Sequence, residues 1–208
     1  MEGRLSTGID LLDRQLGGGL PAGSIVAYCA PPGSQSELLL YELVAARQST
    51  YLTTQRASEA VRDSLVDAGI EEEQATVRDV GTREPLDEMN RLVRTIPDET
   101  NLIIDPIDVL ERREPARYIG FLNDLQTHMV NTESIAVLHC LAGEAVRPNR
   151  DTTRYVADIV FDLDTTINGG DIENRLSVPK FRGGSAPAET IKHNLSDTVT
   201  VDTSRDIA

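Results

Sequence analysis

Short apolar runs alternate with longer segments of helical periodicity through most of the chain. The runs are five to seven residues long, bounded by turn signals, and lie at residues 24–30, 50–54, 76–80, 101–105 and 134–140. Between them, apolar residues at helical spacing predict helices over residues 36–47, 58–68, 85–96 and 115–130. Strands that alternate with helices of this length favour a parallel sheet covered on both faces.

The pattern changes after Ala157. Residues 158–164, 175–181 and 189–201 alternate apolar and polar side chains, and Asn168-Gly169-Gly170 is typical of a hairpin turn. These segments predict antiparallel strands at the edge of the sheet. The sequence therefore predicts a single α/β domain over residues 1–208, with a mainly parallel sheet, helices on both faces and an antiparallel C-terminal extension.

Composition adds a strongly acidic surface to this picture. The chain has 34 acidic and 20 basic residues, a formal net charge of −14, and only two lysines, Lys180 and Lys192. Acid excess with scarce lysine is typical of proteins from a halophile's cytosol, where salt screens self-repulsion. An ordinary acidic protein of a non-halophilic organism is the alternative.

The same composition limits the kinds of partner and cellular setting that we expect for the chain. Direct nucleic-acid binding is not expected, because it needs clustered Lys or Arg and the chain has no basic stripe. No run approaches the roughly 20 apolar residues of a membrane span, and the N-terminus lacks the apolar run of a signal peptide. Cys29 and Cys140 are far apart in apolar runs, which predicts buried thiols in a reduced cytoplasmic setting.

The N-terminal segment carries a specific motif. Residues 4–13 read RLSTGIDLLD and residues 16–24 read LGGGLPAGS, just before the first predicted core strand. This phrase resembles the opening of KaiC- and RadA-type ATPase domains, and YVAD at 155–158 and KFRG at 180–183 resemble motifs near the end of that family. The resemblance spans about residues 4–201 and implies a RecA-like P-loop NTPase fold.

The segment at the position of the P-loop departs from that family. A working loop reads GxxxxGK[ST], in which glycines admit the phosphates, lysine neutralises their charge and the hydroxyl holds Mg²⁺. Here Ala30 and Gln35 replace the two glycines, Ser36 replaces the lysine, and Glu37 replaces the Ser/Thr. Only Pro32, Gly33 and Ser34 keep the family pattern.

Energetic considerations argue against Mg-ATP binding in the usual pose. The missing lysine removes a charge-assisted contact worth about 1.5–3 kcal/mol. The Glu37 carboxylate adds repulsion of roughly 4 kcal/mol per unit charge at ~4 Å and an effective dielectric of ~20. We therefore expect no cofactor, although ATP and Mg²⁺ would be the ligands if the loop still worked.

Three further positions can be compared with the resembled site: two depart from it and one matches it. The paired glutamates that would polarise water in a KaiC-like site are replaced by Gln55 and Arg56, so no catalytic residue is assigned. Asp105, at the end of an apolar strand, matches a Walker-B aspartate, but a strand-end acid that caps the turn at Pro106 is the alternative. We hypothesise that Arg56 bridges to Glu37 or Asp105 and plugs the phosphate site; a solvent-facing Arg56 is the alternative.

The remaining candidates carry weaker signals. His128, His139 and His193 have no partner at metal-ligand spacing, so the sequence predicts structural roles and no metal site. Lys180 and Arg182 match residues that reach a neighbouring subunit's phosphate in the resembled family. With no phosphate expected here, they predict a surface or interface role.

Taken as a resemblance, the family implies a regulatory or scaffolding pseudo-ATPase, with signal transduction as the process. Such a protein would act through an unidentified protein partner and could form a homo-oligomer. The alternatives are an ATP-binding, weakly active KaiC-like ATPase, and an accessory RadA paralogue in DNA repair that works through protein contacts. Fold resemblance alone is a weak guide to function, so these alternatives stay open.

The acidic surface makes a prediction about salt. If it is a halophilic adaptation, the thermal midpoint of unfolding should rise steeply between 0.01 M and molar KCl, because charges repel over about 30 Å at the lower concentration. Thermal melts across that series, with a sodium chloride series as the control for ion type, measure this directly. A thermal midpoint that does not change with salt would favour the alternative, an ordinary acidic protein of a non-halophilic organism.

Overall fold

Within the described residues, one nine-stranded sheet has the order β11-β10-β9-β8-β3-β7-β6-β4-β5. The computed structural model describes residues 3–81, 83–145, 147–168, 171–188, 190–195 and 199–201. The parallel strands are β3 (Ile25–Ala30), β7 (Ile135–Leu141), β6 (Asn101–Asp105), β4 (Ser49–Thr53), β5 (Ala75–Asp79) and β8 (Ile159–Asn168). The antiparallel strands β9 (Asp171–Phe181), β10 (Ile191–Leu195) and β11 (Val199–Val201) complete one edge.

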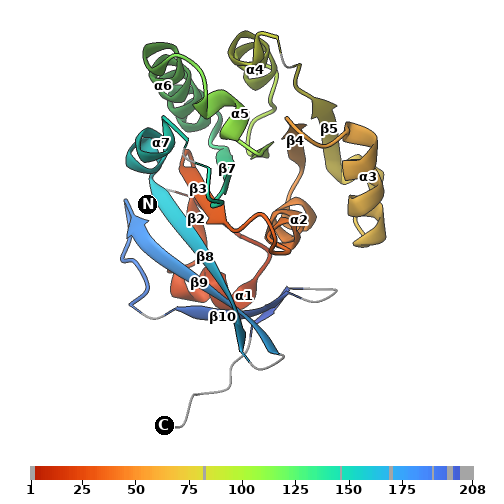
Figure 1. Ribbon diagram of the computed structural model, residues 1–208, viewed down its shortest axis with the longest axis vertical. Helices are drawn as coiled ribbons and strands as arrows, with labels where there is room; N and C mark the ends of the chain where they lie inside the picture. Colours follow the sequence, from red (N-terminus) through yellow and green to blue (C-terminus); the bar gives the residue numbers. More distant parts are fainter. Residues whose placement is uncertain are drawn as a thin grey trace.

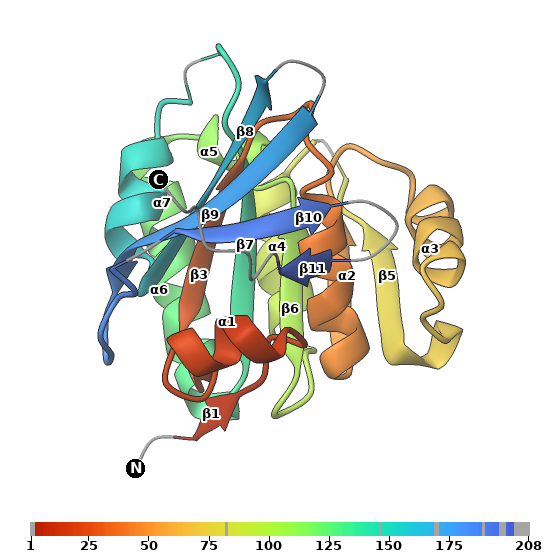
Figure 2. The ribbon, with the colours of Figure 1, turned by 90° about the horizontal axis from the view of Figure 1, so that it is seen from below.

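Helices cover both faces of the sheet (Figure 1). On one face α1 (Asp10–Gln15), α2 (Glu37–Ala46) and α3 (Ser58–Asp67) join an apolar cluster with β3, β6 and β7. Figure 2 shows α1 and α2 on the near side of the sheet. On the other face, α4 (Pro85–Val93), α5 (Asp108–Glu111) and α6 (Pro115–Thr132) bury the second cluster, which α7 (Arg150–Val156) borders. A short antiparallel pair, β1 (Arg4–Leu5) and β2 (Leu20–Pro21), and a 3₁₀ turn at Glu72–Gln74 complete the described elements.

The predicted α/β fold is confirmed. Each of the five predicted core strands is present with its bounds shifted by at most one residue, and the four predicted helices are present as α2, α3, α4 and α6. The antiparallel extension is also present, although β8 itself pairs parallel with β3, so antiparallel pairing begins between β8 and β9. Residues 169–170 of the predicted hairpin turn, and residues 189 and 196–198 of the last predicted strand, lie outside the described residues.

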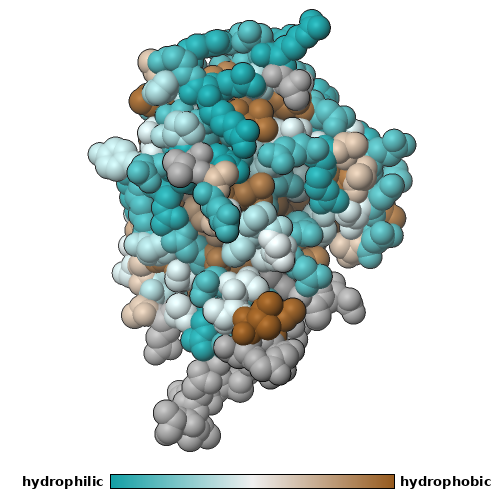
Figure 3. Space-filling model, in the orientation of Figure 1, coloured by the Kyte–Doolittle hydropathy of each residue, from teal (hydrophilic) through white to brown (hydrophobic). Residues whose placement is uncertain are grey.

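The surface is largely polar on the face that Figure 3 shows. Cys29 and Cys140 are buried free thiols on the neighbouring strands β3 and β7, as predicted. No helix in the described part of the chain is long and apolar enough to cross a membrane.

Parallel pairing brings the ends of several core strands to one edge of the sheet. In the register of β6 and β7, Ile104 pairs with Leu138, which places Asp105 and His139 next to each other at that edge. Side chains alternate between the two faces of a strand, so Asp105 and His139 lie on the same face as Val137. That face is the one covered by α2, so both side chains face the start of this helix.

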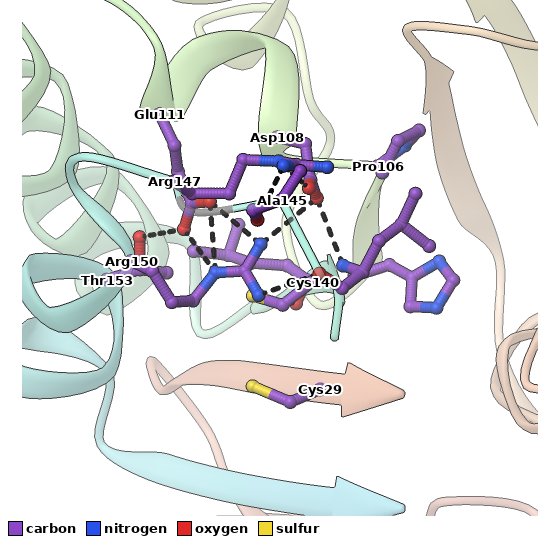
Figure 4. Close-up of polar contacts among 12 residues, drawn as sticks. Cys29, Pro106, Asp108, Glu111, Cys140, Ala145, Arg147, Arg150 and Thr153 are labelled. Atoms are coloured by element: carbon purple, nitrogen blue, oxygen red, sulfur yellow. Dashed lines mark hydrogen bonds and ion pairs between the residues drawn. The ribbon is translucent and has the colours of Figure 1, made fainter. Parts of the chain in front are cut away.

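A buried ionic cluster lies on the opposite face, between α5 and α7 (Figure 4). The carboxylates of Asp108 and Glu111 are fully buried. Arg150 Nη2 lies 2.8 Å from Glu111 Oε2 and 3.2 Å from Asp108 Oδ2, and Arg147 Nε donates to Asp108. Asp108 also accepts from the N–H of Leu141 at 3.0 Å. The cluster therefore ties the helix after β6 to the end of β7 and to α7.

The charged state of Arg150 is strongly favoured in this cluster. Burial alone would lower the pKa of Arg150, but its hydrogen bond to Glu111 and the carboxylates beside it raise that pKa above its ordinary value. Removing one member would leave a buried charge without its partner, which is costly in a low-dielectric interior.

We therefore predict that Arg150→Ala lowers the free energy of unfolding by about 3–5 kcal/mol. Urea unfolding at constant KCl measures it. Arg117→Ala is the matched control, because Arg117 pairs with Asp87 at the surface and its side chain is 52% exposed, so its loss should cost far less. Equal losses in the two variants would contradict a special role for the buried cluster.

Candidate functional site

The loop between β3 and α2 presents Ser36 to the strand ends. The loop turns tightly at its start, where both the N–H and the hydroxyl of Ser34 donate to the carbonyl of Pro31, at 3.0 and 2.6 Å. Ser36 precedes α2 in helical conformation, and its hydroxyl makes no capping hydrogen bond to the helix. Its Oγ lies instead 3.1 Å from Nε2 of His139, so this side chain is directed toward β7.

His139 and Asp105 form the centre of the site. His139 Nδ1 lies 2.6 Å from Asp105 Oδ1, and the second carboxylate oxygen of Asp105 accepts from the hydroxyl of Tyr51 at 2.5 Å. The imidazole stacks on the ring of Tyr28, with 5.4 Å between ring centroids. Ser36, Asp105 and His139 are 3%, 6% and 4% exposed, so this set of hydrogen bonds is almost fully buried.

The contacts of Asp105 set its protonation. Burial alone would raise the pKa of Asp105, but the hydrogen bonds that its carboxylate makes with His139 and accepts from Tyr51 lower that pKa below its ordinary value. The pKa of Tyr51 is raised, because the ring is buried and because its hydroxyl faces the Asp105 carboxylate. Asp105 is therefore ionised and Tyr51 neutral near neutral pH.

A cleft of about 260 Å³ opens beside these side chains. Besides Ser36, Asp105 and His139, its lining consists of Pro32, Ser34, Glu37, Gln55, Arg56, Pro106 and Leu141. Most of the residues expected at a phosphate site thus lie around one cleft at the strand ends. Gly33 and Gln35 belong to the same loop and are exposed.

The predicted bridge from Arg56 to Glu37 or Asp105 is not formed among the described residues. The guanidinium of Arg56 donates to Tyr41 Oη at 3.2 Å, to Ser64 Oγ at 2.7 Å and to the carbonyl of Ala60 at 3.4 Å. The physical reason is that Asp105 already accepts two hydrogen bonds, while α2 and α3 offer Arg56 neutral acceptors nearby. Arg56 lines the cleft but does not plug it, and it does not point freely into solvent either.

The other cations predicted at the surface cap a helix. Lys180 Nζ donates to the carbonyls of Arg154 and Tyr155 at 2.9 and 2.6 Å, and Arg182 donates to those of Tyr155 and Val156 at 2.7 and 3.0 Å. These carbonyls lie at the C-terminal end of α7, where positive charge is favoured. Lys180 and Arg182 therefore hold α7 against β9 in this chain.

His139 is the site residue that sequence reasoning missed. The sequence predicted a structural role because no metal-binding partner lies near it along the chain, and in the described residues no group of three or more His, Cys, Asp or Glu is placed to hold a metal ion. Its partners come from β6 and from the start of α2. The available signal was that Asp105 ends one apolar strand and His139 lies near the end of another strand of the same parallel sheet, where such ends meet.

The strand order and the loop after β3 define an α/β fold of the RecA-like class. The crystal structure of the KaiC-like protein PH0186 from the hyperthermophilic archaeon Pyrococcus horikoshii OT3 is similar to this chain, with a TM-score of 0.77 over 97% of this chain and 100% of that one. The sequence identity is 15%, so this similarity concerns the fold.

The chain belongs to a family described as a family of unknown function, DUF7125, which matches residues 4–208. A search of curated proteins finds no match. The match covers nearly the whole chain, and the description of the family assigns no activity.

The lowered pKa of Asp105 makes a pH-dependent prediction. Because the folded pKa lies below the unfolded value of about 4, Asp105 stabilises the fold above that value and this contribution is lost as pH falls through the folded pKa. Asp105→Asn should lower the free energy of unfolding by about 1.5–3 kcal/mol at pH 7. The difference from wild type should shrink as the pH falls below about 4.

Urea unfolding at constant KCl from pH 7 to pH 3 tests this dependence. Asp63→Asn, at an exposed position of α3, is the control and should change stability little at any pH. A difference between wild type and Asp105→Asn that stays constant over this range would show that the carboxylate charge does not stabilise the fold.

Proposed function

We propose that this chain is a RecA-type pseudo-ATPase of the cytoplasm that acts by binding a protein partner in a regulatory or scaffolding role, without hydrolysing ATP. The observation that carries the proposal is the contact of Ser36 with His139. Ser36 stands at the lysine position of the loop, and its hydroxyl is engaged 3.1 Å from the His139 imidazole.

The residues of the cleft do not fit Mg-ATP. A side chain as short as serine brings no positive charge to the phosphates, and Glu37 places a carboxylate where a hydroxyl would hold Mg²⁺. Asp105 is engaged by His139 and Tyr51 on both oxygens, so a metal ion would have to displace hydrogen bonds of 2.6 and 2.5 Å. Each of these features disfavours the bound nucleotide.

A second candidate function keeps nucleotide binding. Pro32, Gly33 and Ser34 retain the family pattern, and α2 still presents its N-terminus to the cleft, which favours anions. This arrangement supports weak nucleotide binding without an assigned base for hydrolysis. It is the observation behind a weakly active ATPase as the alternative.

Exposed apolar side chains support a partner-binding role. Ile167 and Ile172 pair across β8 and β9 near the end of the hairpin, and they are 75% and 67% exposed. Tyr155, at the end of α7, is 77% exposed. Large apolar side chains at such exposure are suited to contact with another protein. Co-purification in molar KCl is the measurement that would identify that partner and the process, including signal transduction.

Nucleotide binding tests the pseudo-ATPase proposal. In molar KCl, titration calorimetry should give a dissociation constant for Mg-ATP no tighter than about 1 mM, which corresponds to about −4 kcal/mol. Phosphate release should match that of a protein-free control. The physical reason is the missing cation at Ser36 together with the anion at Glu37.

A variant at Glu37 separates the effect of this anion from that of the missing cation at Ser36. Glu37→Gln should tighten nucleotide binding because it removes an anion from the cleft, whereas Glu59→Gln, at an exposed position of α3, should not. A micromolar constant for the wild type would refute the proposal and favour the weakly active ATPase.

A further inference from the structure

Three side chains in the cleft are arranged for nucleophilic chemistry. A carboxylate can only accept hydrogen bonds, so the Asp105 contact at 2.6 Å places the proton of the neutral imidazole on Nδ1 of His139. Nε2 is then an acceptor, and it lies 3.1 Å from the hydroxyl of Ser36. A nucleophile within reach of a base that is itself oriented by a third group is the arrangement that activates a serine.

Two further contacts stabilise the arrangement of Ser36, His139 and Asp105. Tyr51 donates to the second oxygen of Asp105 at 2.5 Å, and the imidazole stacks on Tyr28 at 5.4 Å between centroids. Both contacts fix the plane and the position of the base without using Nε2. The lowered pKa of Asp105 keeps this carboxylate ionised, which stabilises the imidazolium that forms when the base takes a proton.

The backbone around Ser36 also suits acyl transfer. Ser36 follows a strand and a tight loop and directly precedes α2, a helix of 10 residues. The N–H of the next residue, Glu37, makes no hydrogen bond within the described part of the chain. In hydrolases built on parallel sheets, the N–H after the nucleophile stabilises the oxyanion, and the serine, acid and histidine follow one another in the same chain order as Ser36, Asp105 and His139.

We infer that Ser36, His139 and Asp105 form a hydrolytic site for small carboxylic esters. This inference goes beyond the proposed function, which concerns ATP and a protein partner, and it requires no nucleotide. All three side chains line the cleft of about 260 Å³, which suits a small molecule. The carboxylates of Glu37 and Asp105 disfavour an anionic acyl group, and Pro32, Pro106 and Leu141 offer apolar contacts, so the substrate is a neutral or cationic ester.

The reaction balances with water as the co-reactant. Nε2 of His139 takes the Ser36 proton while Oγ bonds to the ester carbonyl carbon, and the carbonyl electron pair moves onto oxygen. Collapse of this intermediate breaks the bond to the alcohol, which leaves with the proton from Nε2, and the acyl group stays on Ser36. Water then attacks in the same way, releasing the carboxylic acid and restoring the serine hydroxyl.

Active-site labelling tests the site without any nucleotide. A small alkyl fluorophosphonate should form one adduct on Ser36, with loss of fluoride, and p-nitrophenyl acetate should leave a transient acetyl group on the same residue. Intact-mass and peptide mass spectrometry locate both adducts. Removing the base with His139→Gln should slow labelling by roughly 10²–10⁴-fold.

Controls separate a reactive serine from general reactivity. Ser36→Ala should abolish the adduct, whereas Ser58→Ala, at the start of α3 outside the cleft, should label like the wild type. Each variant is first shown to unfold cooperatively in molar KCl. If Ser36→Ala does not fold, the position of the adduct in the wild type alone still decides the question.

Two results would overturn the inference. The first is a folded wild type that takes no adduct on Ser36 at millimolar probe, and the second is a His139→Gln variant that labels as fast as the wild type. Neither result bears on the pseudo-ATPase proposal, because these assays contain no ATP. Conversely, tight binding of Mg-ATP would refute that proposal and leave the labelling result standing.

Discussion

The parallel pairing of β6 with β7 is the constraint on which the site depends. It places Asp105 Oδ1 2.6 Å from His139 Nδ1. Both strands also pair with a further neighbour, β6 with β4 and β7 with β3, so they lie in the interior of the sheet. A shift of one residue along either strand would turn one of the two side chains to the opposite face of the sheet. The loop after β3 then needs only to bring Ser36 toward a base that the sheet has already positioned.

Much of the fold was predictable because its signals are local. Apolar runs such as residues 101–105 are bounded by turn residues and are too short for a typical helix. The short helices α5 and α7 were not predicted, because their signals are not local. α5 has four residues and α7 has seven, too few for a periodic pattern. The end of α7 also depends on hydrogen bonds from Lys180, in β9, and from Arg182, just after that strand.

The site was only partly predictable, because its chemistry depends on contacts between distant segments. The sequence indicated the loop and Asp105 through the motifs that they resemble, and these residues do gather around one cleft. The sequence placed His139 near the end of another predicted strand, but it could not indicate that this side chain, 34 residues beyond Asp105, would contact both Asp105 and Ser36. The hypothesis for Arg56 was wrong because charge complementarity alone ignored the hydroxyls of Tyr41 and Ser64, which need a position in three dimensions to be noticed.

The buried cluster of Asp108, Glu111, Arg147 and Arg150 has a consequence for how this chain can change over time. Its charges match in number, two of each sign, so a substitution that removes one leaves another stranded in the interior. A substitution of Arg150 is therefore compatible with folding only if the acidic residues are substituted too, for example by an apolar set of similar volume. Among homologues, these four positions should be kept together or replaced together, whereas the cleft residues can vary independently of them.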